Sequence, residues 1–325
     1  MFNIPTVPTA EELLGKAFRK SVRARAGKSP GRTAEKTMIL TASNILADNL
    51  RAVVRRFPNF DEIGAFYAET IDIVVGLDRL RISLASVTWA STKIHQLSRA
   101  AIGKMARVSD AKAVRKQMFG RTASIMKEIQ PDLDFLNRAR NTINALPALD
   151  DEPTILVAGY PNVGKSSFVA FVTSAKPKIA LYPFTTKGII VGHITYCDRR
   201  YQIVDLPGLL DRPVSKRNAI ELQAISALKN LGDAVLFIVD PSGTSGYEVS
   251  EQLHLLHELR SQVGLPVIVA ANKMDLEPTE PVKEAFGIST KSGEGIAAAL
   301  KASIDLASRT HRAPLQGRPT KLLEA

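Results

Sequence analysis

The chain has 325 residues, 45% of them hydrophobic and 23% charged, which is enough apolar sequence to build the cores of two domains. Its single cysteine, Cys197, excludes a disulfide framework, and its longest apolar runs, such as residues 234–239, are too short to cross a membrane. The start of the chain lacks a secretory leader pattern, so we expect a cytoplasmic protein that does not bind membranes.

The charge is unevenly distributed along the chain. The net charge is +11, and residues 1–150 contain 24 Lys and Arg against 14 Asp and Glu, whereas residues 151–325 contain 19 against 18. This asymmetry predicts a polyanionic partner for the first half. The alternative is a solvated helical surface rich in arginine.

The first half is predicted to be helical. Thr9-Ala10-Glu11-Glu12 is a capping box, and apolar residues at helical spacing predict helices over residues 32–56, 61–75 and 77–108. Asp110 and Pro131 mark the starts of two more helices, which end near residues 129 and 146. Long helices with short connections predict an elongated antiparallel bundle.

Basic residues gather in three clusters of this half, within residues 19–28, 51–56 and 112–121. Lys112, Arg115 and Lys116 are spaced to share one helix face. We interpret Trp89 and the phenylalanines as core packing rather than as platforms for stacking bases.

Residues 146–153 are rich in Pro and Asp and mark a domain boundary, after which strands and helices alternate. We therefore expect a basic helical bundle domain over residues 1–150 and an α/β domain over residues 151–308. Residues 309–325 are expected to be a short, mobile tail.

A phosphate-binding loop follows the apolar run 154–158. Its glycines would let successive N–H groups face phosphate oxygens, with Lys165 reaching the β- and γ-phosphates and the Ser166 hydroxyl binding Mg²⁺. The predicted loop contacts are Gly159, Tyr160, Pro161, Asn162, Val163, Gly164, Lys165, Ser166 and Ser167.

Asp205-Leu206-Pro207-Gly208 closes the next strand-like run. Asp205 would face the water shell of the magnesium ion, and the Gly208 N–H would approach the γ-phosphate.

Two further segments predict that the nucleotide is GTP. Asn272-Lys273-Met274-Asp275 follows the run 267–271, and Asp275 can accept two hydrogen bonds from guanine that adenine cannot donate. Backbone N–H groups of Ser289, Thr290 and Lys291 could meet the guanine O6. The order of all these motifs, each at the end of a predicted strand, makes a chance match improbable.

The segment 182–187 contains adjacent threonines that could close over the nucleotide. We favour Thr186 as the residue that completes the Mg²⁺ shell only when a γ-phosphate is bound, with Thr185 as the alternative. The strands that follow, residues 188–196 and 200–204, are joined by a short turn and should form the one antiparallel pair of a mostly parallel sheet.

The motifs at 159–167, 182–187, 191–193 and 205–213 resemble the Nog branch of the Obg-like GTPases, and Ile4-Pro5-Thr6-Val7-Pro8-Thr9 resembles the start of that family's helical domain. The resemblance implies a P-loop GTPase domain in a GTP-driven factor for maturation of the large ribosomal subunit. It also implies that the helical domain binds ribosomal RNA. Because the sequence ends soon after the predicted GTPase domain, we expect it to resemble the shorter archaeal form rather than the eukaryotic members with their long C-terminal extension. Leu206 also replaces a more usual threonine.

Leu209 stands where Ras-type GTPases place a glutamine that orients the attacking water. Hydrolysis would therefore be slow until a partner supplies a group or a cation assists. Asn162 resembles the potassium-coordinating asparagine of related GTPases, so K⁺ is one candidate and a purely loop-shaping role is the other. Our catalytic candidates are Lys165, Thr186, Gly208 and Asn162.

The sequence is compatible with two functions. The first is a GTP-gated ribosome assembly factor that exchanges GTP and GDP, monomeric in solution. The second is a regulatory switch read by protein effectors, in which the basic bundle serves oligomerisation or a membrane surface.

Overall fold

The computed structural model describes residues 2–26, 31–147, 149–150, 152–173, 178–180, 182, 188–207, 210–211, 225, 227–278 and 280–311. The chain divides into two compact units. We call the unit formed by residues 2–61 and 75–144 the helical unit. We call the other, formed by residues 62–74 and the chain from residue 145 onward, the sheet unit.

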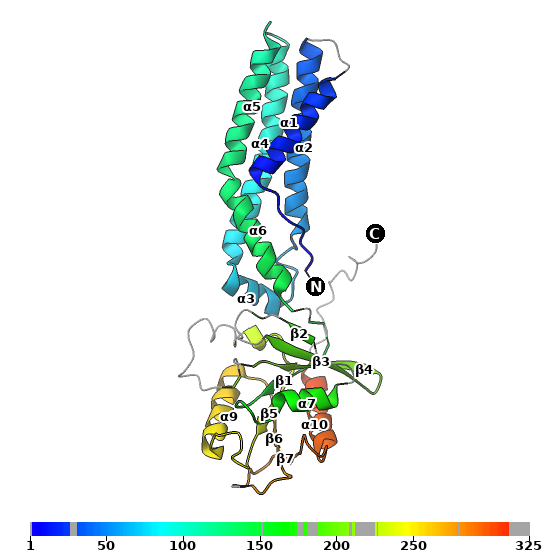
Figure 1. Cartoon of the computed structure of the whole chain (residues 1–325), viewed down its shortest axis with the longest axis vertical. Coiled ribbons are helices and arrows are strands. Elements are labelled where there is room, and N and C mark those ends of the chain that lie inside the picture. The colour runs from blue at the N-terminus through cyan, green and yellow to red at the C-terminus, as the bar shows by residue number, and fades with distance from the viewer. Residues whose placement is uncertain are drawn as a thin grey trace. The chain divides into compact units, whose positions relative to one another are not determined.

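The helical unit is an antiparallel bundle, as predicted. α1, α2, α4 and α5 alternate in direction, α6 continues in the direction of α5, and α2 packs against both α1 and α4 (Figure 1). Its helices are α1 (Ala10–Arg25), α2 (Arg32–Arg56), α4 (Leu77–Met105), α5 (Ala111–Glu128) and α6 (Gln130–Ala145).

Side-chain caps start two of these helices where the sequence predicts. The Thr9 hydroxyl accepts from the Glu12 N–H at 3.2 Å, and the Glu12 carboxylate accepts from the Thr9 N–H at 2.9 Å. The Asp110 carboxylate accepts from the Ala113 N–H at 2.9 Å and starts α5. The α2 bounds match the prediction, whereas α4 ends at Met105 rather than near residue 108.

The core of the helical unit contains Leu46, Leu50 and Ile94, all fully buried. Trp89 is 44% exposed, so its interpretation as a core residue was wrong. The buried positions Val87 and Ala90 define the inner face of α4, and Trp89 lies two residues after Val87, about 200° around the helix.

The sheet unit contains a seven-stranded sheet in the order β2-β3-β4-β1-β5-β6-β7. Strands β4, β1, β5, β6 and β7 are mutually parallel. The bounds are β1 (Thr154–Ala158), β2 (Lys178–Ala180), β3 (Ile189–Tyr196), β4 (Arg199–Asp205), β5 (Ala234–Val239), β6 (Val267–Ala271) and β7 (Phe286–Gly287).

The predicted antiparallel pair is β3 with β4, and the short strand β2 adds a second antiparallel partner to β3. Cys197 and Asp198 form the turn between β3 and β4 with φ values of 48° and 59°. Two consecutive left-handed residues match the backbone twist of a tight hairpin.

Helices cover both faces of the sheet. α9 (Val249–Val263) lies on one face, and α7 (Lys165–Val172) and α10 (Ile296–Thr310) lie on the other (Figure 1). All six residues of β5 are fully buried in the core between them. None of the described helices is long and apolar enough to span a membrane.

α3 (Ala65–Val74) belongs to the sheet unit, although it lies within the residues assigned by sequence to the helical domain. Its Phe66 is buried in the core of the sheet unit and stacks on Tyr182, with ring centroids 6.0 Å apart. α3 begins at Ala65 rather than at residue 61, because the backbone turns over residues 60–63.

Candidate functional site

The carboxyl ends of four parallel strands meet at one edge of the sheet. The loop 159–164 follows β1, Asp205 ends β4, Asp240 follows β5 and Asn272 follows β6. Ligands of open α/β sheets bind at this edge.

Two loop glycines leave no room for a side chain. Gly159 has φ 135°, and a Cβ there would collide with the Ile238 carbonyl oxygen. Gly164 has φ 103°, and a Cβ there would collide with the Asn272 amide. The loop therefore holds a conformation open only to glycine at both positions, which lets its N–H groups approach an anion.

Lys165 begins α7 and is 7% exposed. Its Nζ donates to the carbonyl oxygens of Gly159 and Tyr160, both at 2.8 Å. Burial lowers the pKa of Lys165, and the nearby Asp205 partly opposes that shift. The ammonium is thus held beside the loop at a helix N-terminus, where an anion is stabilised.

Ser166 and Asp205 form a pair of oxygen donors. The Ser166 hydroxyl donates to Asp205 Oδ2 at 2.7 Å. Asp205 is fully buried, burial raises its pKa, and its Oδ1 has no hydrogen-bond partner among the described residues. A buried carboxylate oxygen beside a hydroxyl fits Mg²⁺, which prefers hard oxygen ligands and retains water.

Asn272 joins the phosphate loop to the segment 289–291. Its buried amide Nδ2 donates to the Val163 carbonyl at 2.8 Å and to Thr290 Oγ1 at 3.2 Å. Its Oδ1 accepts from the Thr290 N–H at 3.0 Å. The predicted phosphate-binding and guanine-binding segments are therefore brought together by one side chain.

Asp275 is oriented by its neighbours. The buried Ser289 hydroxyl donates to Asp275 Oδ1 at 2.7 Å and lowers the pKa of Asp275, and Lys291 Nζ lies 3.8 Å from Oδ2. Ser289 Oγ also accepts from the Ser292 N–H at 3.2 Å. The carboxylate stays charged and is held against the segment predicted to meet guanine.

The sequence interpretation missed the group that holds Lys273. Its Nζ lies 2.6 Å from Asp240 Oδ2 and 2.8 Å from Thr244 Oγ1. Burial alone would raise the pKa of Asp240, but hydrogen bonds from Lys273 and Ser242 lower it to about 2. Gln252 binds both the N–H and the carbonyl of Asp240. An Asp directly after an apolar strand, followed by Pro-Ser-Gly, was the available signal.

Four predicted residues, Thr185, Thr186, Gly208 and Leu209, lie outside the described residues. Asn162 is exposed and has φ 63°, a left-handed conformation that asparagine tolerates better than most residues. This backbone requirement is by itself a reason for asparagine at that position.

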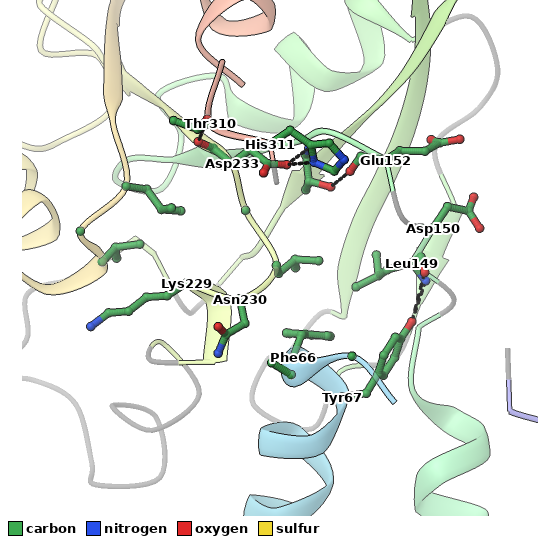
Figure 2. A pocket seen from close by; sticks show the side chains of 18 of the residues that line it. Phe66, Tyr67, Leu149, Asp150, Glu152, Lys229, Asn230, Asp233, Thr310 and His311 are labelled. Carbon is green, nitrogen blue, oxygen red and sulfur yellow. Dashed lines mark hydrogen bonds and ion pairs between the residues drawn. The ribbon is translucent and has the colours of Figure 1, made fainter. Parts of the chain in front are cut away.

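A cavity of about 620 Å³ lies at the opposite, amino-terminal edge of the strands (Figure 2). Asp233 in its wall accepts from the Thr154 N–H at 2.8 Å and lies 3.0 Å from His311 Nδ1. Tyr67 binds the Leu149 N–H at 2.8 Å. These bonds tie the end of α10 to the sheet and the boundary segment, which is the stretch before β1 that contains Leu149, Asp150 and Glu152, to α3. All of them lie away from the predicted nucleotide contacts.

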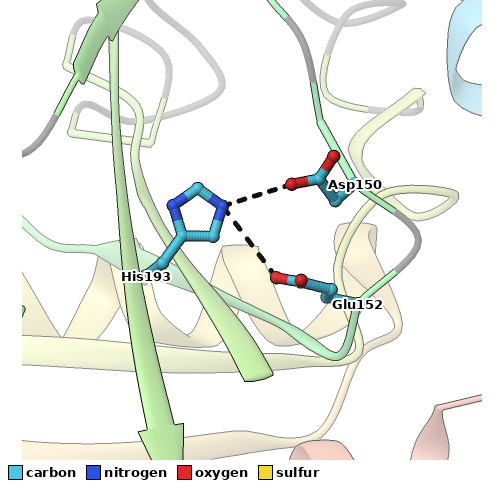
Figure 3. Close-up of side chains that lie close together, drawn as sticks. All are labelled: Asp150, Glu152 and His193. Carbon is cyan, nitrogen blue, oxygen red and sulfur yellow. Dashed lines mark ion pairs between the residues drawn. The ribbon is translucent and has the colours of Figure 1, made fainter. Parts of the chain in front are cut away.

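Beside this cavity, His193 of β3 faces two carboxylates of the boundary segment (Figure 3). Its Nε2 lies 3.6 Å from Asp150 Oδ2 and 3.9 Å from Glu152 Oε2. Glu152 also pairs with Arg200 at 3.3 Å, and Gln202 binds the Asp150 backbone. Arg200 and Gln202, both from β4, thus fasten the boundary segment to the sheet beside His193.

Two known protein families match parts of the chain. The NOG1 N-terminal helical domain matches residues 2–150, and Nucleolar GTP-binding protein 1 (NOG1) matches residues 219–275. An uncharacterised protein of Methanocaldococcus jannaschii is 39% identical over 291 residues, which are 86% of this chain and 82% of the relative.

Nucleolar GTP-binding protein 1 of Arabidopsis thaliana is 37% identical over 241 residues, 72% of this chain and 36% of the relative. A solved Plasmodium falciparum chain assigned to the same protein is 31% identical, with a TM-score of 0.45, and covers 50% of this chain and 91% of that one. This chain spans 36% to 46% of the length of the nucleolar relatives that it matches. The chain belongs to the nucleolar GTP-binding protein 1 family.

Proposed function

We propose that the chain binds GTP and GDP at the carboxyl edge of its sheet and hydrolyses GTP there. One observation carries this proposal: Asn272 bonds to both the phosphate loop and Thr290. A single ligand reaching from Lys165 to Asp275 would therefore span two segments that are already fastened together. The relatives are named as GTP-binding proteins, which supports the same ligand.

In this proposal each group has one task. Lys165 and the loop N–H groups neutralise the β- and γ-phosphates, and Asp275 accepts from guanine N1 and N2. Ser166 and Asp205 would hold Mg²⁺, which supplies charge neutralisation between the phosphates. The proposed metal ligand Thr186 and the γ-phosphate contact Gly208 remain predictions from sequence.

Nucleotide titration tests the specificity directly. We expect GTP and GDP to displace a fluorescent guanine nucleotide and ATP to do so at least about a hundredfold more weakly, because adenine cannot donate two hydrogen bonds to Asp275. Equal competition by ATP would contradict the guanine assignment while leaving a phosphate site possible.

We further propose that hydrolysis depends on a partner or on K⁺, since Leu209 cannot orient water. Because the backbone of Asn162 is left-handed, a glycine variant can distinguish the two candidate roles of this residue, K⁺ coordination and shaping of the loop. Asn162→Gly keeps the left-handed backbone accessible but removes the side chain. If Asn162 coordinates K⁺, this variant should bind GTP normally and lose the rate difference between K⁺ and Na⁺ at equal ionic strength. A retained difference would leave the loop-shaping role.

We propose that the helical unit binds ribosomal RNA and that the protein acts in large ribosomal subunit assembly. The net charge of +10 over residues 1–150 supports this partner, because phosphate contacts by Lys and Arg release counterions. Co-sedimentation with large subunits in GTP but not in GDP is the expected result. Binding only to protein effectors, with no RNA crosslinks, would favour the regulatory switch.

A further inference from the structure

A polar hollow of about 390 Å³ lies in the helical unit, lined by α2 and α4. Arg51 reaches it from α2, while His95, Gln96 and Arg99 reach it from α4. No carboxylate lines it. The lining residues of α4 recur every three or four positions, so they occupy one face of that helix.

The two arginines of the hollow retain unused donors. Arg51 Nη2 lies 2.6 Å from His95 Nε2 and 3.1 Å from Asp48 Oδ1, and Asp48 is 67% exposed. Since a guanidinium can only donate, the neutral imidazole of His95 accepts this bond. Neither Arg51 Nη1 nor the Arg99 guanidinium has a hydrogen bond or ion pair with the described residues.

The hydroxyl groups of the hollow are already engaged as donors. Thr88 donates to the Leu84 carbonyl at 2.9 Å, Ser91 to Ala47 at 3.1 Å and Thr92 to Thr88 at 3.1 Å. The remaining donors are therefore the guanidinium and amide groups. Positive charge with several unused N–H groups suits an anion that presents several oxygen acceptors, as a phosphate does.

An exposed aromatic ring lies beside these donors. Trp89, the only tryptophan of the chain, is 44% exposed. It precedes Thr92 by three residues and Gln96 by seven, so it lies on the same side of α4 as the hollow. A base next to a bound backbone phosphate could stack on this ring, provided that the base is unpaired.

We propose that this hollow binds one backbone phosphate of single-stranded RNA through Arg51 and Arg99, with an adjacent base stacked on Trp89. This inference rests on the proposal that the helical unit binds RNA. The hollow would add one defined contact to the general electrostatic attraction between the helical unit and RNA.

The hollow should also make RNA binding depend on pH. Burial and the neighbouring Arg51 and Arg99 lower the pKa of His95, and Asp48 partly opposes them. A bound phosphate would favour the imidazolium form, so RNA affinity should rise as the pH falls from about 8 to about 6.

The test uses the full chain and a short single-stranded RNA, with binding followed by anisotropy of the RNA and by the fluorescence of Trp89. We expect quenching of Trp89, affinity at least about tenfold lower in Arg99→Glu, and a weaker pH dependence in His95→Gln. The matched control is Lys116→Glu on α5, which makes the same charge change at an exposed residue. This variant should lose only the RNA affinity that comes from general electrostatic attraction, and bound RNA should still quench the fluorescence of Trp89.

Competition with inorganic phosphate shows whether the hollow binds a phosphate group alone or the backbone phosphate of RNA together with a base. Inorganic phosphate should compete with RNA at high concentration without quenching Trp89, because it carries no base. Two results would contradict binding at the hollow while leaving RNA binding in place. One is RNA binding with no change in Trp89 fluorescence, and the other is an equal loss of RNA affinity in Arg99→Glu and Lys116→Glu. A parent chain that binds no RNA would refute the RNA proposal, and this inference with it.

Discussion

The two units use charge in opposite ways. In the sheet unit, Lys165, Asp205 and Asp240 are buried at the carboxyl edge, and each is held by named partners. In the helical unit, most basic side chains are exposed, and their ion pairs, such as Arg51 with Asp48 and Arg81 with Asp61, lie at the surface. Buried charges with fixed geometry suit a small ligand of defined shape, whereas exposed ones suit a polyanion bound through its charge. Removing a charge, or the group that holds it, in either unit tests this contrast.

The largest effect is expected from Asn272→Ala. This change removes the bonds to the buried Val163 carbonyl and to the partly buried Thr290 N–H. We expect a loss of about 2–4 kcal/mol in the free energy of unfolding and a loss of GTP affinity of at least about a hundredfold. Denaturant unfolding and nucleotide titration measure the two. Lys112→Ala, at an exposed site, should change neither.

Arg115→Ala is the exception that sharpens the contrast within the helical unit. Arg115 bonds to the buried Glu35 and its guanidinium lies 5.3 Å from the centre of the Phe119 ring, so it is a structural residue of a cluster that we predicted as a shared binding face. Its removal leaves Glu35 with Arg25, at 3.9 Å, as its one ion-pair partner among the described residues. We expect destabilisation by about 2–3 kcal/mol.

The matched change Lys116→Ala should instead weaken RNA binding with little effect on stability, since Lys116 is exposed. If the two variants lose stability equally, the assignment of Arg115 to the fold is wrong.

Asp240→Asn should have an intermediate effect, because it leaves the Lys273 ammonium without its carboxylate. We expect destabilisation of about 1–3 kcal/mol at neutral pH and weaker GTP binding. The folded pKa of Asp240, about 2, lies below its unfolded value. Its carboxylate therefore stabilises the fold above pH 4, and this contribution disappears as the pH falls toward 2. Parent and variant should converge in stability at acid pH.

Asp205→Asn should give the smallest effect on stability, and in the opposite direction. Burial raises the folded pKa of Asp205, so without metal its ionisation destabilises the fold as the pH rises through that value. The variant should melt slightly above the parent at neutral pH in EDTA and lose stabilisation by Mg²⁺ with GTP. A variant that melts below the parent in EDTA would contradict this account of the carboxylate.

Most strands, the hairpin turn and the glycine loop after β1 were predictable because they depend on local patterns, whereas β2 was not predicted. The apolar run 154–158 forms β1 at those residues, and the capping box at Thr9 starts α1. Features set by tertiary contacts were not predictable. The packing of α3 with the sheet unit depends on Phe66 meeting Tyr182, more than a hundred residues away. The roles of Asp240 and Arg115 likewise depend on distant partners, and the exposure of Trp89 depends on which face of α4 turns inward.

The central claim is that Asp275, held by Ser289, selects a guanine nucleotide at the carboxyl edge of the sheet. The most direct test is calorimetric titration of the parent and of Asp275→Asn with GTP and with xanthosine triphosphate. An asparagine amide presents a donor where guanine also donates, and xanthine has an acceptor at that position. The variant should therefore lose about a hundredfold in affinity for GTP and prefer the xanthosine nucleotide. Equal affinity of parent and variant for GTP would contradict the claim.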